Sequence, residues 1–225
     1  MNLTRFESLI GEDKLNKIKN LNVLVLGLGG VGGYVVESLT RCGIGKITLV
    51  DGDTIKPSNI NRQIIVTKRN INHYKTKEWK KRIKLINKDA IVNLVNLKIT
   101  ESNIELLFSD KYDYVIDACD TTVVKVKLAE ECYKRNIKLI SCMGTANKLD
   151  ATKLKITTLD KTDYDPLAKK IRGLIKNKDI MRSVAVVSSI EKAINVGVLG
   201  STAYVPGVAG LLITNYLVND VLGNK

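Results

Sequence analysis

The sequence predicts an α/β fold in which helices cover both faces of a mostly parallel sheet. Short apolar runs of strand length alternate with longer segments whose apolar residues recur at helical spacing. Such alternation is typical of a doubly wound, Rossmann-like sheet. From Ala151 the pattern changes, because residues 153–158 alternate in polarity as a half-exposed strand does. We therefore expect an antiparallel C-terminal extension of the same sheet.

The elements follow in chain order. Residues 5–20 have the pattern of an amphipathic helix, which Gly11 interrupts. A chain of 225 residues is long enough for one domain with a substantial core. We expect that domain to be 1–225, with a helical segment at 1–20 and the extension at 151–225. Strands are expected at 21–26, 47–50, 91–97, 112–117, 137–141, 153–158 and 183–189, and helices at 31–42, 75–87, 101–108, 122–135, 166–176 and 206–222.

The composition favours a polyanionic partner. Lys and Arg number 36 against 23 Asp and Glu, which gives a formal charge of +13. A cationic surface binds phosphates by releasing counterions, although the same excess also serves solubility. The four cysteines form no Cys-x-x-Cys pair, so no structural zinc site is predicted. The absence of a signal-peptide pattern, and an apolar stretch at 205–218 too short for a membrane span, predict a cytoplasmic protein.

A glycine-rich turn is the strongest local signal. The first strand leads through Gly27, Gly29, Gly30 and Gly32 directly into a helix. Such glycines permit the tight turn, the approach of a phosphate to the backbone and close packing of helix on strand. The helix N-terminus favours an anion, and Asp51, after the second strand, is suited to bind a ribose hydroxyl. The sequence therefore predicts a nucleotide site.

The loop after Asp51 favours chemistry at the phosphates over hydride transfer. Asp53, Asn59, Arg62 and Gln63 follow within a few residues. An arginine neutralises the charge of a nucleotide triphosphate, and a carboxylate can hold Mg2+. A nicotinamide-dependent enzyme needs only to hold its pyrophosphate.

Several motifs together resemble one family. GLGGVG at 27–32, VDGDTIKPSNINRQ at 50–63, Lys75 and VIDACD at 115–120 are similar to the ubiquitin-activating-enzyme-like (ThiF-type) adenylating enzymes. The stretches at 140–172 and 202–223 resemble the tRNA threonylcarbamoyladenosine dehydratase branch of that family. The resemblance implies an enzyme that uses ATP and Mg2+ to convert a carboxylate into an acyl-adenylate.

The resemblance also implies roles for single residues. Arg62 and Lys75 would stabilise the triphosphate and the departing pyrophosphate, and Asp120 would hold Mg2+. Adenine would lie at Leu97, where the third strand ends. The expected catalytic residues are Arg62, Lys75 and Asp120, and the expected nucleotide-binding residues are Gly27, Gly29, Gly30, Gly32, Asp51, Asp53, Asn59, Gln63 and Leu97.

The substrate implied by the resemblance is the carboxylate of threonylcarbamoyladenosine beside the tRNA anticodon. Its adenylate would cyclise internally and release AMP, for a net loss of water. The resemblance further implies a homodimer, with Arg5 as a residue that could cross the interface. Lys169, Lys170 and Arg172, on the basic helix at 166–176, are candidates for a surface that faces tRNA. A sulfur-relay protein partner has no support in the sequence.

Three other functions stay open at this stage. The chain could adenylate the C-terminus of a ubiquitin-like sulfur-carrier protein, with Cys119 or Cys142 as an acyl acceptor. It could be a nicotinamide-dependent oxidoreductase, which would leave Arg62, Lys75 and Asp120 without a role. It could also bind a nucleotide without chemistry. The only histidine, His73, lies in a polar loop and is a poor candidate for acid–base catalysis.

Overall fold

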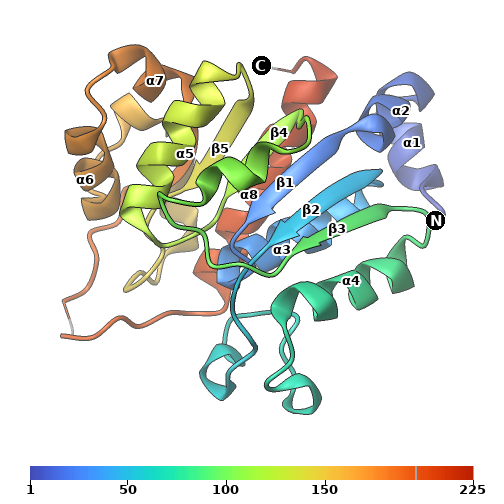
Figure 1. The fold of residues 1–225 in the computed structure, drawn as a ribbon, viewed down its shortest axis with the longest axis horizontal. Helices are drawn as coiled ribbons and strands as arrows, with labels where there is room; N and C mark the ends of the chain where they lie inside the picture. The colour runs from blue at the N-terminus through green and yellow to red at the C-terminus, as the bar shows by residue number, and fades with distance from the viewer. Residues whose placement is uncertain (196, 225) are drawn as a thin grey trace.

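The computed structural model describes residues 1–195 and 197–224, so residues 196 and 225 of the predicted extension lie outside the described part. A single seven-stranded sheet in the order β3-β2-β1-β4-β5-β7-β6 organises the chain (Figure 1). All neighbouring strands are parallel except β6 and β7, which are antiparallel. The predicted fold class is thus confirmed. The strands are β1 (Asn22–Leu26), β2 (Lys46–Val50), β3 (Ile91–Val95), β4 (Tyr114–Asp117), β5 (Lys138–Cys142), β6 (Leu154–Thr158) and β7 (Ala185–Ser189).

The helices agree with the expected ranges to within one residue except in four places. The helix expected at 166–176 ends at Leu174. Residues 101–108 form only a short 3-10 helix at Ile104–Phe108. The last helix begins at Tyr204, two residues before Pro206. A helix that was not predicted begins after Asn177, whose side chain caps it by accepting the Asp179 N–H at 2.8 Å. The helices are α1 (Thr4–Ile10), α2 (Glu12–Asn20), α3 (Gly30–Arg41), α4 (Lys75–Ile86), α5 (Thr122–Lys134), α6 (Pro166–Leu174), α7 (Lys178–Ser183) and α8 (Tyr204–Leu222).

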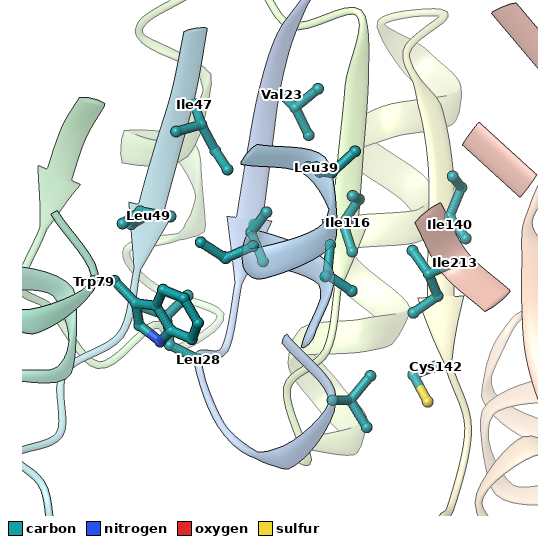
Figure 2. Close-up of a cluster of buried hydrophobic side chains, with 14 of the residues drawn as sticks. Val23, Leu28, Leu39, Ile47, Leu49, Trp79, Ile116, Ile140, Cys142 and Ile213 are labelled. Carbon is teal, nitrogen blue, oxygen red and sulfur yellow. The ribbon is translucent and has the colours of Figure 1, made fainter. Parts of the chain in front are cut away.

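Two apolar clusters, one on each face of the sheet, hold the layers together. On the first face, α3, α4 and α8 place Leu39, Trp79 and Ile213 against the central strands (Figure 2). On the second face, α5, α6 and α7 cover the same strands with residues such as Leu128 and Ile171. The central strands read as continuous apolar runs because both faces of a parallel sheet are covered.

Helix α8 closes the fold. Among the described residues it is the one helix long and apolar enough to cross a membrane by length and composition, and half of its apolar window is buried in the chain. It packs along α3 and reaches β5, β6 and β7.

The strand register brings the carboxyl ends of the central strands to one level. Leu26 of β1 lies beside Val50 of β2 and beside Asp117 of β4, and Asp117 lies beside Ser141 of β5. In open α/β sheets this edge is where ligands bind. The loops that follow these strands therefore share one surface.

A buried ion pair reinforces this edge between β4 and β5. Lys125 of α5 lies 2.9 Å from the Asp117 carboxylate, and both side chains are buried. Asp117 also accepts hydrogen bonds from the Ser141 hydroxyl at 2.6 Å and the Cys119 N–H at 3.2 Å. Lys125 donates in turn to the Cys142 carbonyl at 2.8 Å. Burial acts to lower the pKa of Lys125, but the surrounding acidic groups, with Asp117 first among them, together outweigh it and the pKa is raised.

Removing the cation of this pair should be costly. Lys125→Met is expected to lower the free energy of unfolding by about 3–5 kcal/mol, because Asp117 would keep a buried charge without a partner. Urea unfolding of the variant and the wild type measures the difference. The matched control is Arg182→Met in the exposed Arg182–Asp179 pair, which should change the free energy by less than about 1 kcal/mol. Equal losses in the two variants would contradict the role assigned to Lys125.

Candidate functional site

A cleft of about 730 Å³ lies over the carboxyl ends of β1, β2, β4 and β5. Every residue predicted for the site lines it except Gly32. The predicted residues in the cleft are Gly27, Gly29, Gly30, Asp51, Asp53, Asn59, Arg62, Gln63, Lys75, Leu97 and Asp120.

The glycine turn forms the floor of the cleft. Gly27 has a φ of +88°, and a Cβ there would lie 2.7 Å from the Ala118 carbonyl oxygen. A Cβ at Gly32 would lie 1.8 Å from the Gly27 carbonyl oxygen, so this glycine lets α3 pack against β1 and does not face the cleft. A Cβ added at Gly29 would have only the Gln63 side-chain amide nitrogen within 4 Å, at 3.8 Å. The turn therefore leaves backbone at Gly29 open to the cleft, at the N-terminus of α3.

Asp51 ties the turn to the following loop. Its carboxylate accepts the Leu28 N–H and the Asp53 N–H, each at 2.8 Å. The side chain is 9% exposed. These bonds fix its orientation at the end of β2, beside the glycine turn.

Lys75 is held between two carboxylates. Its amino group lies 3.2 Å from Asp51 and 3.0 Å from Asp53, and its side chain is 6% exposed. The hydrogen bond from Lys75 lowers the pKa of Asp53 against the opposing effect of burial, with help from the charges of Lys56 and Lys98. A lysine at a helix N-terminus opposes the helix dipole, which is offset here by its two acidic partners.

Arg62 and Gln63 both line the cleft, but their polar groups differ in their hydrogen-bond partners. The Arg62 guanidinium donates to the Ser58 carbonyl at 2.8 Å and to the Asn61 side chain at 2.9 Å. Over residues 1–195 and 197–224 it takes part in no ion pair. Gln63 is 6% exposed, and its Oε1 atom is buried and has no hydrogen-bond partner among the described residues.

Asn59 shapes the loop that carries these residues. Its side-chain oxygen accepts the Lys56 N–H at 3.0 Å, and its carbonyl accepts the N–H groups of Arg62 and Gln63. Asn59 is 8% exposed. Its observed contacts are thus those of a residue that positions Arg62 and Gln63.

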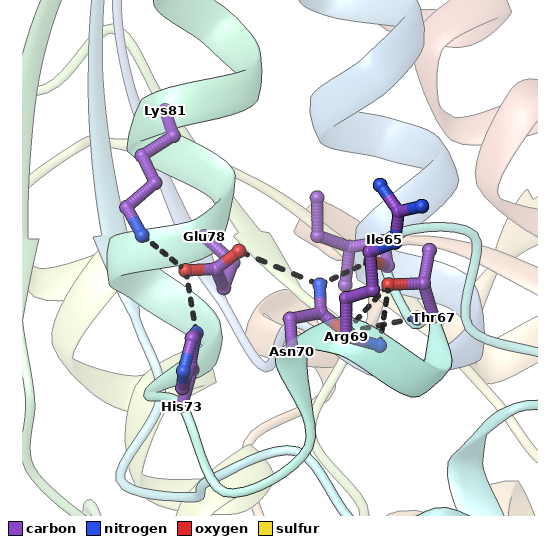
Figure 3. Close-up of polar contacts among 7 residues, drawn as sticks. All are labelled: Ile65, Thr67, Arg69, Asn70, His73, Glu78 and Lys81. Carbon is purple, nitrogen blue, oxygen red and sulfur yellow. Dashed lines mark hydrogen bonds and ion pairs between the residues drawn. The ribbon is translucent and has the colours of Figure 1, made fainter.

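The remainder of the loop is anchored to α4 (Figure 3). Glu78 accepts from Lys81 at 2.7 Å, from His73 at 3.1 Å and from Asn70 at 3.4 Å. Burial acts to raise the pKa of Glu78, but these donors outweigh it and the pKa is lowered. Asn70 also donates to the Ile65 carbonyl at 2.8 Å. The structure thus gives His73 a contact that supports the loop, and places it outside the residues that line the cleft.

Asp120 is exposed at the rim of the cleft, beyond the buried Asp117. The described residues contain no group of three or more His, Cys, Asp or Glu side chains that could hold a metal ion. Mg2+ commonly takes only one or two protein carboxylates and completes its shell with water and substrate phosphates. Asp120 therefore fits a Mg2+ ion that arrives with a nucleotide.

Behind the far end of the cleft, after β5, lies a further buried pair that no sequence motif predicted. Lys148 donates to the Gly144 carbonyl at 2.8 Å and lies 3.4 Å from Asp165. Asp165 accepts the Gly144 N–H at 3.1 Å and caps α6 by accepting the N–H groups of Leu167 and Ala168. Gly144 and Leu167 both line the cleft. The substrate-side loop is thus fixed to the start of α6.

Cys119 and Cys142 both line the cleft, as their positions in the sequence suggested. Burial raises the pKa of Cys142 to about 12. Burial and the Asp117 carboxylate also raise the pKa of Cys119. Only the thiolate is a strong nucleophile, so neither residue is poised to accept an acyl group at neutral pH.

Both thiols should therefore react slowly with an alkylating reagent in the native protein. At pH 7.5 we expect iodoacetamide to modify Cys119 at least about 100-fold more slowly in the native protein than in urea, because the folded state suppresses the thiolate. Peptide mass spectrometry over a time course measures both rates, and Cys119→Ser should keep the ATP-dependent activity of the wild type. Rapid native labelling, together with loss of activity in Cys119→Ser, would make Cys119 a candidate nucleophile again.

Comparison with known proteins gives concordant results. A model of the ThiF family matches residues 3–224. The tRNA threonylcarbamoyladenosine dehydratase of Bacillus subtilis is 39% identical over 97% of this chain and 94% of its own length. The Escherichia coli protein of that name is 36% identical over 81% of this chain and 71% of its own length. The crystal structure of the E. coli enzyme in complex with ATP has a TM-score of 0.93 at 32% identity, and the match covers 99% of this chain and 94% of that one.

These similarities extend over the glycine turn, the polar loop and the C-terminal extension alike, since the family match runs through almost all of the described residues. They confirm the resemblance that the motifs at 27–32, 50–63 and 115–120 indicated. The chain belongs to the ThiF family.

Proposed function

We propose that this protein adenylates the carboxylate of N6-threonylcarbamoyladenosine in tRNA with ATP and promotes its cyclisation. The observation that carries the proposal is the convergence of the glycine turn, Arg62 and Gln63 in one cleft. Relatives that match nearly the whole chain bear the name of that enzyme, and one of their structures holds ATP. The proposed domain is the single unit 1–225.

From the order of the strands we infer that each of the two substrates occupies one half of the cleft. Asp51 and Leu97 follow β2 and β3, on one side of the glycine turn, so the nucleoside of ATP would lie over that half. The phosphates would lie at Gly29 and Gly30, near β1 and β4. The loop at Gly144, after β5, borders the other half and would receive the carboxylate.

The chemistry needs charge neutralisation and alignment more than proton transfer. A carboxylate oxygen of the substrate attacks the α-phosphorus, and the bond to pyrophosphate breaks. Arg62 stabilises the charge on the phosphates, and Gln63 orients the reacting groups. Lys75, paired with Asp51 and Asp53, holds these two carboxylates in place beside the phosphate site. A nitrogen of the substrate then attacks the activated carbonyl carbon, AMP leaves, the proton of that nitrogen is released to water, and the ring closes with net loss of water.

A Mg2+ ion held by Asp120 and the phosphates would add further charge stabilisation. We also infer, from the family resemblance, that the protein is a homodimer and that it acts in the cytoplasm. The burial of half of the apolar window of α8 supports a soluble protein.

Pyrophosphate exchange tests the proposal most directly. With tRNA that carries threonylcarbamoyladenosine, Arg62→Ala should lower the rate of ATP–pyrophosphate exchange about 10²–10³-fold, because a cation aimed at the transition-state charge is lost. The rate is measured with radiolabelled pyrophosphate. Arg69→Ala is the matched control, since Arg69 is exposed in the same loop and does not line the cleft.

The choice of RNA distinguishes the possible functions. Exchange with modified tRNA but not with unmodified tRNA or no tRNA supports the proposal. Exchange with a carrier-protein C-terminus alone would replace the substrate. ATP binding without exchange under any condition would indicate a nucleotide sensor.

A further inference from the structure

Tyr164 is an exposed residue two positions before α6, and it does not line the cleft. Its side chain is 74% exposed, and its φ is +55°, in the left-handed region that residues other than glycine, asparagine and aspartate rarely adopt. In the part of the chain that the structure describes, its ring and its hydroxyl make no hydrogen bond or ring contact. Strained, exposed positions of this kind concentrate at functional sites.

The neighbouring residue places Tyr164 at the substrate side of the cleft. Asp165 is buried and binds the Gly144 N–H, and Leu167, two residues further on, lines the cleft. The half of the cleft on this side borders β5 and lies away from Asp51 and Leu97. Tyr164 thus stands beside the region proposed to receive the tRNA carboxylate.

Helix α6 supplies a cation on the same side. Lys170 follows Leu167 by three residues and therefore lies near the cleft-facing side of the helix. Lys169 projects about 100° away from Lys170, on the opposite flank. Both lysines are exposed, and no ion pair involves either of them among the described residues. Arg172 is different, because its guanidinium donates to the Thr162 carbonyl at 2.9 Å and so supports the segment before Tyr164.

We propose that Tyr164 and Lys170 form the docking surface for the anticodon loop, with the ring of Tyr164 stacked on an unpaired base next to the modified nucleoside and Lys170 bound to a backbone phosphate. Single-stranded loops are recognised by this combination of aromatic stacking and positive charge. The absence of an ion pair at Lys170 among the described residues and the net charge of +13 both favour a polyanionic partner. This inference rests on the proposed function, because it assigns the surface to the same tRNA.

The test measures binding of a fluorescein-labelled anticodon stem-loop RNA that carries threonylcarbamoyladenosine, by anisotropy at several salt concentrations. Tyr164→Asn removes the ring and suits a positive φ, so it should fold at least as well as the wild type. We expect it to weaken RNA binding about tenfold, which corresponds to the loss of one stacked base. Tyr164→Phe, which keeps the ring, should bind within about twofold of the wild type.

Lysine variants test the phosphate contact. Lys170→Ala should weaken RNA binding and reduce the magnitude of the salt slope by about 0.7–0.9, as expected for one phosphate contact. Lys169→Ala is the matched control on the same helix and should leave the salt slope unchanged. ATP affinity, which does not depend on this surface, should be equal in all four variants.

The possible outcomes distinguish a wrong docking surface from a wrong proposed function. Unchanged RNA affinity in both Tyr164→Asn and Lys170→Ala would overturn the docking surface, even if the wild type converts modified tRNA. Failure of the wild type to bind any tRNA stem-loop would overturn the proposed function and the surface together. Equal losses in Lys169→Ala and Lys170→Ala would indicate a general charge effect and overturn the assigned orientation.

Discussion

Buried lysine–aspartate pairs are the constraint on which the functional edge of this fold depends. Lys75 pairs with Asp51 after β2, Lys125 with Asp117 at the end of β4, and Lys148 with Asp165 beside the loop after β5. The lysine side chains are 6%, 1% and 2% exposed. Charges at such depth are stable only when they remain paired and hydrogen-bonded. The pairs therefore allow little change in the positions of the loops that they join.

Each pair also binds backbone, and this links the fold to the cleft. Asp51 holds the N–H of Leu28 in the glycine turn, Asp117 holds the N–H of Cys119, and Asp165 holds the N–H of Gly144. Three of the loops that border the cleft are thus fixed by charge-assisted hydrogen bonds from buried carboxylates. Precise positioning of two substrates requires rigid support of this kind, because adenylation depends on alignment of the carboxylate with the α-phosphorus.

Local patterns made most of the fold and the nucleotide half of the cleft predictable. The glycine turn and Asp51 lie on consecutive strands, so their meeting follows from a parallel sheet. Lys148 and Asp165 are 17 positions apart and belong to no short motif, so their pairing emerges only from tertiary packing. Gly32 was expected to bind the nucleotide; it does not line the cleft, and a Cβ there would clash with the Gly27 carbonyl, so the close packing of α3 on β1 requires a glycine at this position. Helix α7 was missed because only its Asn177 cap marks its start.

The pairing of the buried lysines also determines where the positive charge of the protein acts. A lysine held by a carboxylate contributes little net field, so Lys75, Lys125 and Lys148 do not make the cleft cationic. The field there comes from cations without an ion pair in the described structure, such as Arg62 within the cleft and Lys170 beside it. Arg62 lines the cleft, and Lys170 lies on α6, whose Leu167 lines the end of the cleft near β5. Unpaired cations at separate places favour polyanionic ligands, and transfer of an adenylyl group from ATP to a tRNA carboxylate brings two polyanions together.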